Sequence, residues 1–245
     1  VGSARYLQRQ GFQALATTSA GCAWSEGRPD GAVSLQATLD HLRLMAAATD
    51  LPLNADFGDG FGATPDDVGQ AVTAALDTGI AALSIEDASG LADAPLRPLD
   101  EAVQRLRAAR AAIDRAAADV LLVGRAENFF VGVPDLDDTL RRLRAYAAAG
   151  ADVLYAPGIT TVEQIQAVVA AADGTPVNLL VGGPTALTLR DIAALGVRRV
   201  SLGGALARAA WGGLMQATDS LVREGRFDGL QQAAAGAALN DLFRS

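Results

Sequence analysis

The sequence predicts one α/β domain, a (β/α)8 TIM-type barrel whose first strand is missing from this chain. Short apolar runs alternate with alanine- and leucine-rich helical runs along all 245 residues. Continuous apolar runs of this length are typical of parallel strands that are buried on both faces. Strands that alternate with helices indicate a parallel sheet, and no linker interrupts the pattern. We therefore expect residues 1–245 to form a single barrel domain.

The expected elements begin with a helical stretch, GSARYLQRQG, at the start of the chain. Because a barrel begins with a strand, we expect the missing strand to lie upstream of Val1, unless the barrel closes in another way. The strands expected after this helix are Ala14–Thr18, Pro52–Asp56, Ala82–Glu86, Val120–Arg125, Val153–Ala156, Val177–Val181 and Arg199–Ser201.

Helix signals separate these strands. Thr64 is a suitable N-cap with Pro65 at the first helical position, and Thr161 forms a capping box with Gln164. Glycines that suit the ends of helices precede the next strands at Gly11, Gly79, Gly150 and Gly196. We therefore expect helices to connect the strands, as a barrel requires.

The residues after the last expected strand, 205–245, are more than one barrel helix requires. They contain ALARAAWGGLMQATDSLVREG and then the apolar stretch FDGLQQAAAGAALNDLF. An apolar segment without a place on a closed barrel needs another surface to cover it. We expect this C-terminal helical segment to pack on another subunit or to be exchanged with it.

Charge and residue usage exclude several classes of partner. The formal net charge is −8, which argues against nucleic acid and anionic membranes because both select basic surfaces. No apolar run approaches the ~20 residues of a membrane span. Cys22 is the single cysteine, so an intrachain disulfide is excluded. Scarce cysteine fits a reducing compartment, and we expect a cytoplasmic protein in which this thiol is structural.

The chain contains no lysine and one histidine, His41. Schiff-base chemistry and the lysine-dependent phosphate loop are therefore excluded. His41 lies in the helical stretch SLQATLDHLRLMAAATD, away from every expected strand end. Histidine-based triads and zinc sites are accordingly poor interpretations.

Acidic side chains follow three of the expected strands at the point where each strand ends. Because the carboxyl ends of parallel strands meet at one edge of a barrel, we expect these side chains to converge around a single cation, Arg125. Crowded carboxylates repel each other unless a hard cation lies among them, and such oxygen-rich groups suit Mg²⁺. The residues concerned are Asp56, Asp59, Glu86, Asp87 and Glu127.

A competing motif occupies the first of these positions. The stretch from Gly58 to Ala63 matches G-x-G-x-x-[GA] and lies between a strand and a helix, as in dinucleotide-binding proteins. However, Asp66 and Asp67 open the following helix. Helix N-termini bind phosphate because they are positive, so these carboxylates argue against a dinucleotide.

Four segments, GFQALATTSAG, LPLNADFGDGFG, LSIEDASG and VLLVGRAEN, resemble the isocitrate lyase/phosphoenolpyruvate mutase superfamily in order and spacing. The resemblance extends through AGADVLYAPG and LGVRRVSLGGALARAA. It implies a (β/α)8 barrel whose last helix is usually exchanged between subunits, hence a homodimer or homotetramer. It also implies bound Mg²⁺, with Mn²⁺ as a substitute, and a small 2-oxo or 2-hydroxy carboxylic acid as substrate.

The resemblance assigns roles to particular residues. Asp56 matches the direct metal ligand, Glu86 matches a glutamate that positions metal-bound water, and Asp30 matches an aspartate that supports the metal through water. Arg125 matches the arginine that neutralises the substrate carboxylate. Backbone N–H groups hold the substrate carboxylate in the matching turn, which here comprises Thr18, Ser19 and Ala20. Structural ion pairing at strand ends, or polar residues that simply end a strand, are the alternatives.

Two departures from the superfamily pattern affect the expected chemistry. Gly58 replaces the second aspartate of the metal motif, and Asp59 follows it. Neighbouring residues on a strand point to opposite faces, so Asp59 replaces the lost ligand only if the backbone bends. The segment ASGLADAPLRPLDEAV also contains no cysteine, histidine or lysine. It therefore lacks the catalytic loop of the lyases and the gating loop of the mutases.

This reduced equipment favours cleavage next to a metal-stabilised enolate without a general acid on that loop. Decarboxylation of a 2-oxo dicarboxylate such as oxaloacetate fits. Pyruvate, oxaloacetate and 2-oxoglutarate are the 2-oxo acids whose binding would narrow the substrate by chain length. Glu127, Asn128 and Asn178 are further candidates for substrate binding or proton transfer, unless they are structural hydrogen-bonding groups. Two other functions stay open. One is a 2-oxo acid binding protein with little turnover, and the other is an enzyme that acts on a phosphonopyruvate-like P–C bond.

Overall fold

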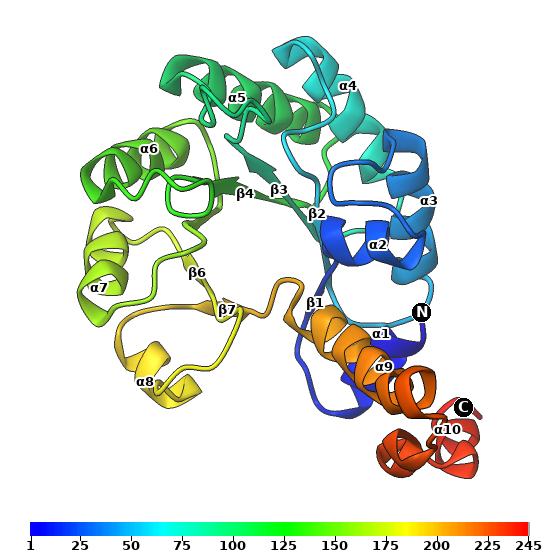
Figure 1. Cartoon of the computed structure of the whole chain (residues 1–245). Coiled ribbons are helices and arrows are strands. Elements are labelled where there is room, and N and C mark those ends of the chain that lie inside the picture. The colour runs from blue at the N-terminus through cyan, green and yellow to red at the C-terminus, as the bar shows by residue number, and fades with distance from the viewer. Residues whose placement is uncertain (245) are drawn as a thin grey trace.

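The computed structural model describes residues 1–244. Its strands form one parallel seven-stranded sheet in chain order. Figure 1 shows this sheet curved into a nearly closed barrel with helices around it. The prediction of a TIM-type barrel with one strand fewer than eight is confirmed. The strands are β1 Leu15–Ala16, β2 Leu53–Asp56, β3 Ala82–Glu86, β4 Leu121–Arg125, β5 Val153–Tyr155, β6 Val177–Leu180 and β7 Arg199–Ser201.

Helices connect successive strands and cover the outside of the sheet (Figure 1). Within residues 1–244, no helix is both long and apolar enough to cross a membrane. The helices are α1 Gly2–Arg9, α2 Ser19–Ser25, α3 Leu35–Ala46, α4 Pro65–Leu76, α5 Leu99–Arg115, α6 Leu136–Ala148, α7 Val162–Ala171, α8 Leu189–Ala194, α9 Ala205–Glu224, the 3-10 helix η1 Asp228–Gln232 and α10 Gly236–Leu242.

The helix starts form where the side chains predict them. The Thr161–Gln164 capping box is present at the start of α7. Thr64 caps α4 and forms a full box with Asp67, whose carboxylate accepts the Thr64 N–H at 2.9 Å. The sequence predicted only the cap in this case. These reciprocal bonds satisfy backbone donors that a helix start otherwise leaves unpaired.

The alternation of side chains along each strand separates two environments. On β2, Leu53 and Ala55 are buried in the large hydrophobic core that lies between sheet and helices. Asn54 and Asp56 alternate with them and therefore face the barrel interior. A second, small cluster of Val123, Val153 and Tyr155 is distinct from that core. The barrel interior thus combines a few apolar side chains with polar groups, and the candidate site lies there.

The C-terminal segment, residues 205–244, has little packing within this chain. None of its three helices contains a buried residue. Figure 1 shows α9 leading away from the sheet and α10 lying beyond it, near the N-terminus. Arg9 donates to the carbonyl of Asp241 at 3.3 Å, which ties α10 to α1. Large apolar side chains stay exposed, including Trp211, Leu214, Met215, Val222 and Phe227.

Candidate active site

Arg125, the last residue of β4, lies at the centre of the carboxylates that the sequence expected to converge. Its Nη1 atom is 3.2 Å from Asp56 Oδ1 and 3.1 Å from Glu86 Oε2. Its Nε atom donates to Glu127. We call these four residues the Arg125 group. Asp56, Glu86 and Arg125 end three adjacent parallel strands, so the sheet itself brings them together.

Aromatic rings hold the guanidinium group of Arg125 from other sides. Its central carbon is 5.3 Å from the ring centre of Tyr155 and 5.8 Å from that of Phe130. Tyr155 ends β5 and is the register partner of Arg125. Cation–π contacts of this kind stabilise a guanidinium group that is shielded from water. No hydrogen bond is described for the Nη2 atom of Arg125 within residues 1–244, and this atom is not fully enclosed, so it is a candidate donor to a bound anion.

The turn between β1 and α2 holds Asp56 in place. The Asp56 N–H donates to Thr17 Oγ1, and the Ser19 N–H donates to Asp56 Oδ2, each at 2.9 Å. Thr18 caps α2 through its hydroxyl, which accepts the Gly21 N–H. The turn formed by Thr18, Ser19 and Ala20 therefore lies beside Asp56. In the structure the Ser19 N–H is bonded to the Asp56 carboxylate, whereas the sequence predicted that this N–H would bind the substrate carboxylate.

Glu127 is positioned from behind by Asp87. The Glu127 N–H donates to Asp87 Oδ1 at 2.8 Å. The other oxygen of Asp87 pairs with Arg142 at 3.0 Å and accepts the Tyr146 hydroxyl. Asp87 thus points away from the Arg125 group, because adjacent strand residues alternate and Glu86 points inward. The expectation that Asp87 joins the central group is wrong.

Asn128 lies next to Glu127 and is fully buried. Its Nδ2 atom donates to Asp138 at 2.8 Å, whereas its Oδ1 atom is buried without a partner. Asn178 is buried on β6, where its Nδ2 donates to Ser201 Oγ at 2.9 Å. Asp30 is exposed and accepts the N–H of Gly31 at 3.0 Å, and no described contact brings it to the Arg125 group.

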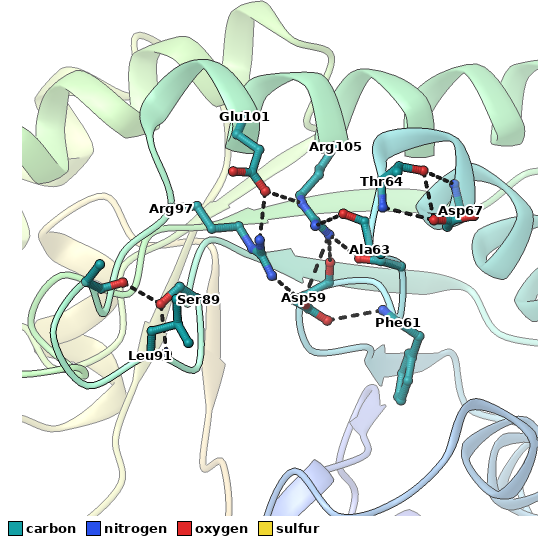
Figure 2. A network of polar contacts seen from close by, with 12 residues as sticks. Asp59, Phe61, Ala63, Thr64, Asp67, Ser89, Leu91, Arg97, Glu101 and Arg105 are labelled. Carbon is teal, nitrogen blue, oxygen red and sulfur yellow. Dashed lines mark hydrogen bonds and ion pairs between the residues drawn. The ribbon is translucent and has the colours of Figure 1, made fainter.

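Asp59 belongs to a different set of contacts, drawn in Figure 2. Its carboxylate is 2.7 Å from Arg97 Nη2 and 3.9 Å from Arg105 Nη1. Glu101 contacts both of these guanidinium groups, at 2.7 and 3.1 Å. We call these four residues the Asp59 network. Figure 2 shows Asp59 and Glu101 on opposite sides of the two arginines.

The backbone at Gly58 explains this placement. Its φ of +54° lies in the left-handed region that favours glycine, and the chain turns there. The bend that Asp59 would need as a ligand is thus present, but its carboxylate faces Arg97. Residues 1–244 contain no group of three or more His, Cys, Asp or Glu side chains arranged to hold a metal. Asp59 is thus engaged by Arg97 rather than by the Arg125 group.

The loop that departs from the superfamily pattern is closed by its own hydrogen bonds. Ala88 and Leu96 form an antiparallel bridge, and the Ser89 N–H donates to the Pro95 carbonyl at 2.9 Å. The Arg97 N–H donates to the Asp87 carbonyl at 2.8 Å. The Ala88–Leu96 bridge thus closes this short loop, and the Asp59 network holds Arg97 at its C-terminal end.

The motif that competed with a metal site has its backbone donors occupied. The Thr64 and Asp67 N–H groups at the start of α4 are used by the capping box. Arg105 donates to the carbonyls of Gly62 and Ala63 at 2.8 and 3.0 Å. The loop therefore points carbonyl groups at the Arg105 side chain, whereas a dinucleotide phosphate would need free N–H groups there. This arrangement supports the rejection of a dinucleotide site.

Burial and like charge shift the titration of the Arg125 group. Burial raises the pKa of Glu86 to about 8, with Arg125 opposing and the carboxylates of Glu127 and Asp56 adding to the rise. Burial likewise raises the pKa of Glu127, although Arg125 opposes it. The pKa of Arg125 is raised well above its ordinary value because Glu86, Glu127 and Asp56 outweigh the opposing effect of burial. The group therefore has more carboxylates than its one arginine balances.

Asp56 and Glu86 have the chemistry and the placement that suit Mg²⁺. Both carboxylates contact the same Nη1 atom of Arg125, so their oxygens lie close together at the barrel mouth. Mg²⁺ binds proteins through one or two carboxylates and keeps water or substrate oxygens for its other positions. Burial favours the protonated form of Glu86, whereas a divalent cation would favour its ionised form.

Sequence reasoning did not identify Tyr155, Asn54 and Arg199 as neighbours of the site. Asn54 accepts from Arg199 at 2.9 Å inside the barrel, and Tyr155 contacts Arg125. The available signal was the period of two along each strand, which puts Asn54 on the same face as Asp56. Applied to every strand, the same period also selects Asn178 with Leu180, and Arg199 with Ser201.

Comparison with known proteins places these residues in a family. Residues 1–222 match the family model described as phosphoenolpyruvate phosphomutase. An oxaloacetate decarboxylase of Bradyrhizobium sp. (strain ORS 278) is 34% identical over 183 residues, which cover 72% of this chain and 60% of that protein. A 2-methylisocitrate lyase of Salmonella typhimurium is 36% identical over 62% of this chain and 53% of its own length. This chain thus spans about 60% of the decarboxylase.

Solved structures agree over more of the chain. A Burkholderia cenocepacia J2315 protein, named only provisionally as a lyase/mutase, has a TM-score of 0.95 and 47% identity, covering 100% of this chain and 88% of its own. Oxaloacetate acetylhydrolase in complex with oxalate has a TM-score of 0.86 and 28% identity, covering 98% and 85%. The sequence resemblance is confirmed: the chain belongs to the phosphoenolpyruvate mutase family, within the isocitrate lyase/phosphoenolpyruvate mutase superfamily.

Proposed function

We propose that this protein is a Mg²⁺-dependent lyase that decarboxylates or cleaves a small 2-oxo or 2-hydroxy dicarboxylate. The observation that carries the proposal is the Arg125 group, in which two adjacent carboxylates and one arginine meet at the mouth of the barrel. The names of the relatives, oxaloacetate decarboxylase and 2-methylisocitrate lyase, support a small carboxylate as the substrate class.

The side chains divide the work. Asp56 and Glu86 would hold Mg²⁺, or Mn²⁺ in its place, whose Lewis acidity stabilises the negative charge that develops on a substrate oxygen. The open Nη2 of Arg125 donates to a substrate carboxylate, and its aromatic neighbours keep it in position. Burial raises the pKa of Glu127 and so favours its protonated form, which places this residue to deliver a proton to a carbanion.

The loop between β3 and α5 favours decarboxylation among the possible cleavages. It contributes no cysteine, histidine or lysine, and its Ser89 and Arg97 side chains are bonded within the loop and to the Asp59 network, respectively. A carboxylate group leaves as CO₂ without the help of a general acid. Cleavage into two carboxylic acids instead requires an acid that protonates the departing carbon. Oxaloacetate is the first substrate to test, because its departing carboxylate is on the carbon next to the keto group and leaves an enolate. 2-Oxoglutarate, whose second carboxylate is one carbon farther away, tests binding by chain length.

The decisive experiment is calorimetric titration with pyruvate, oxaloacetate and 2-oxoglutarate, with and without Mg²⁺, while CO₂ and product release are followed. We expect metal-dependent binding with turnover of a dicarboxylate. Metal-dependent binding without turnover would support a 2-oxo acid binding protein instead, which the fixed loop and the diverted Asp59 also permit. Turnover of phosphonopyruvate alone would support a P–C bond enzyme, and no binding of any of these acids would refute the proposal.

We also propose that the C-terminal segment, residues 205–245, binds a second copy of the chain in a homodimer or homotetramer. Exposed apolar side chains concentrate there, and Met215, Val222 and Phe227 are 65%, 83% and 69% exposed. Apolar patches of this kind mark association surfaces. Light scattering should give the mass of two or four chains; a monomer at micromolar concentration would contradict the proposal.

A further inference from the structure

Arg199, the first residue of β7, extends into the barrel and is bound there by two amides. Its Nε atom donates to Asn178 Oδ1 and its Nη1 atom donates to Asn54 Oδ1, each at 2.9 Å. These acceptors come from β6, which neighbours β7, and from β2, near the other end of the sheet. Because both acceptors are neutral, they satisfy hydrogen bonds of the guanidinium group without balancing its charge.

This lack of a carboxylate distinguishes Arg199 from the other arginines of the interior. In the part of the chain that the structure describes, every other buried or half-buried arginine has at least one acidic partner in a salt bridge: Arg97, Arg105, Arg110, Arg125 and Arg142. Burial lowers the pKa of Arg199, and only Tyr155 opposes that shift. A desolvated, uncompensated cation is costly to keep, so an anion supplied from outside would stabilise it.

The position of Arg199 links it to the Arg125 group. Asn54, one of its acceptors, lies two residues before Asp56 on the same face of β2. Asn178, the other acceptor, is the register partner of Tyr155, whose ring contacts Arg125. The guanidinium group of Arg199 therefore lies in the layer of side chains directly beneath the carboxylates at the barrel mouth.

Part of the Arg199 guanidinium group is available to a ligand. Arginine has five N–H donors, and two hydrogen bonds to protein acceptors are described for Arg199. Side-chain nitrogens and oxygens that are both enclosed and unpartnered within residues 1–244 are Arg97 Nε, Asn128 Oδ1 and Ser220 Oγ. The Nη2 atom of Arg199 has no described partner and does not belong to this set, so it is not fully enclosed by the protein.

Charge balance indicates which anion fits. When Glu127 holds its proton, Asp56 and Glu86 carry two negative charges and Arg125 carries one positive charge, so a bound Mg²⁺ would leave the group with one positive charge. The single charge of a 2-oxo monocarboxylate balances that charge. A dicarboxylate adds a second charge inside a barrel of low polarity, where only a further cation can balance it. Arg199 is the cation in that position.

We propose that Arg199 binds the second carboxylate of the substrate and makes the site selective for dianionic over monoanionic 2-oxo acids. This inference rests on the proposed function, because it requires a 2-oxo acid at the Arg125 group. It adds a specificity-determining residue, in which Asn54 and Asn178 orient the guanidinium group and leave Nη2 for the ligand.

The test uses pairs of acids that match in chain length and differ only at the far end. Oxaloacetate is paired with 2-oxobutyrate, and 2-oxoglutarate with 2-oxovalerate, in titrations with Mg²⁺. We expect the wild-type protein to bind one of the dicarboxylates about 10- to 100-fold more tightly than its partner, as a charge-assisted hydrogen bond to a desolvated carboxylate allows. In Arg199→Gln this preference should disappear through loss of dicarboxylate affinity alone.

Two further variants separate recognition from folding. Arg198→Gln removes the adjacent arginine, which is exposed, and should keep the wild-type preference. Arg199→Lys retains the charge without the fork of donors and should restore part of it. If Arg199→Gln does not fold, labelling of the wild-type protein with phenylglyoxal gives an independent result. The dicarboxylate should then protect the Arg199 peptide and the matched monocarboxylate should not.

The outcomes distinguish this inference from the proposed function. If the wild-type protein binds both members of each pair equally, the site is real but Arg199 does not select for charge, and the inference is wrong. Equal weakening of both ligands in Arg199→Gln would likewise assign Arg199 a purely structural role. If Mg²⁺ promotes binding of neither acid, the proposed function itself fails and the inference falls with it.

Discussion

The Arg125 group and the Asp59 network start only three residues apart in sequence, at Asp56 and Asp59, yet their charges are balanced differently. The Arg125 group sets three carboxylates around one guanidinium group. The Asp59 network sets two carboxylates around two guanidinium groups. Arg105 in that network also donates to three backbone carbonyls, so it fixes the loop before α4.

The titration of one glutamate in each set shows what this difference means. Burial raises the pKa of Glu86 to about 8. In the Asp59 network burial acts in the same direction on Glu101, but hydrogen bonds from Arg105 and Arg97 outweigh it and lower the pKa. Balanced ion pairs are typical of structure, whereas perturbed groups in an unbalanced set are typical of functional sites. The comparison therefore separates the carboxylate available to a metal from the one that supports the fold.

The largest expected effect comes from replacing Asp56, with the same replacement at Asp59 as the comparison. Asp56→Asn should reduce metal-dependent turnover by at least about 100-fold, because it removes a proposed ligand and an anchor of Arg125. Asp59→Asn should retain Mg²⁺ affinity within about threefold, since its carboxylate faces Arg97. Titration of both variants with Mg²⁺ measures this directly. If both lose the metal equally, Asp59 is a ligand after all and the division drawn here is wrong.

Removal of Arg105 should act on stability and leave the metal site intact. Arg105→Met removes the side-chain donor of three backbone carbonyls and leaves Asp59 and Glu101 with Arg97 alone, so we expect a destabilisation of about 3–5 kcal/mol. Urea unfolding would give the loss, with Arg107→Met as the control because that arginine is exposed on the same helix. A stability unchanged from wild type would show that the network is not structural.

The smallest effect is a dependence of stability on pH from Glu86. The folded state keeps the Glu86 proton to about pH 8, against an ordinary value of 4.5. Between these pH values the folded state binds more protons than the unfolded state, so the free energy of unfolding falls as pH rises. The slope is at most about 1.4 kcal/mol per pH unit for this group.

Thermal or urea unfolding from pH 5 to pH 9 without divalent cations checks this. Glu86→Gln should flatten the profile, apart from a smaller contribution of the same sign from Glu127, whose pKa is also raised by burial. Mg²⁺ competes with the proton, so it should stabilise the wild-type protein more at pH 9 than at pH 6. A wild-type profile that rises with pH would mean that Glu86 is ionised in the folded state without a metal.

The sequence by itself determined the strands, the helix caps and the edge of the sheet where the site lies. These features follow from local rules: Thr161 and Gln164 cap a helix wherever they stand, and apolar runs become parallel strands. Because parallel strands end on one side of a barrel, Asp56, Glu86 and Arg125 could be brought together from sequence. The resemblance to the superfamily depended on the same residues in the same order.

Only the tertiary structure decided which carboxylates share the central arginine. Asp59 and Asp87 follow strand ends, as Asp56 and Glu86 do. However, Asp59 pairs with Arg97 before α5 and Arg105 on α5, and Asp87 pairs with Arg142 on α6. No local sequence pattern predicts those partners. The environment of Arg199 likewise depends on Asn54, 145 residues earlier in the chain. Local propensity acts over a few residues, whereas the direction of a charged side chain depends on counter-charges that only the closed fold brings near.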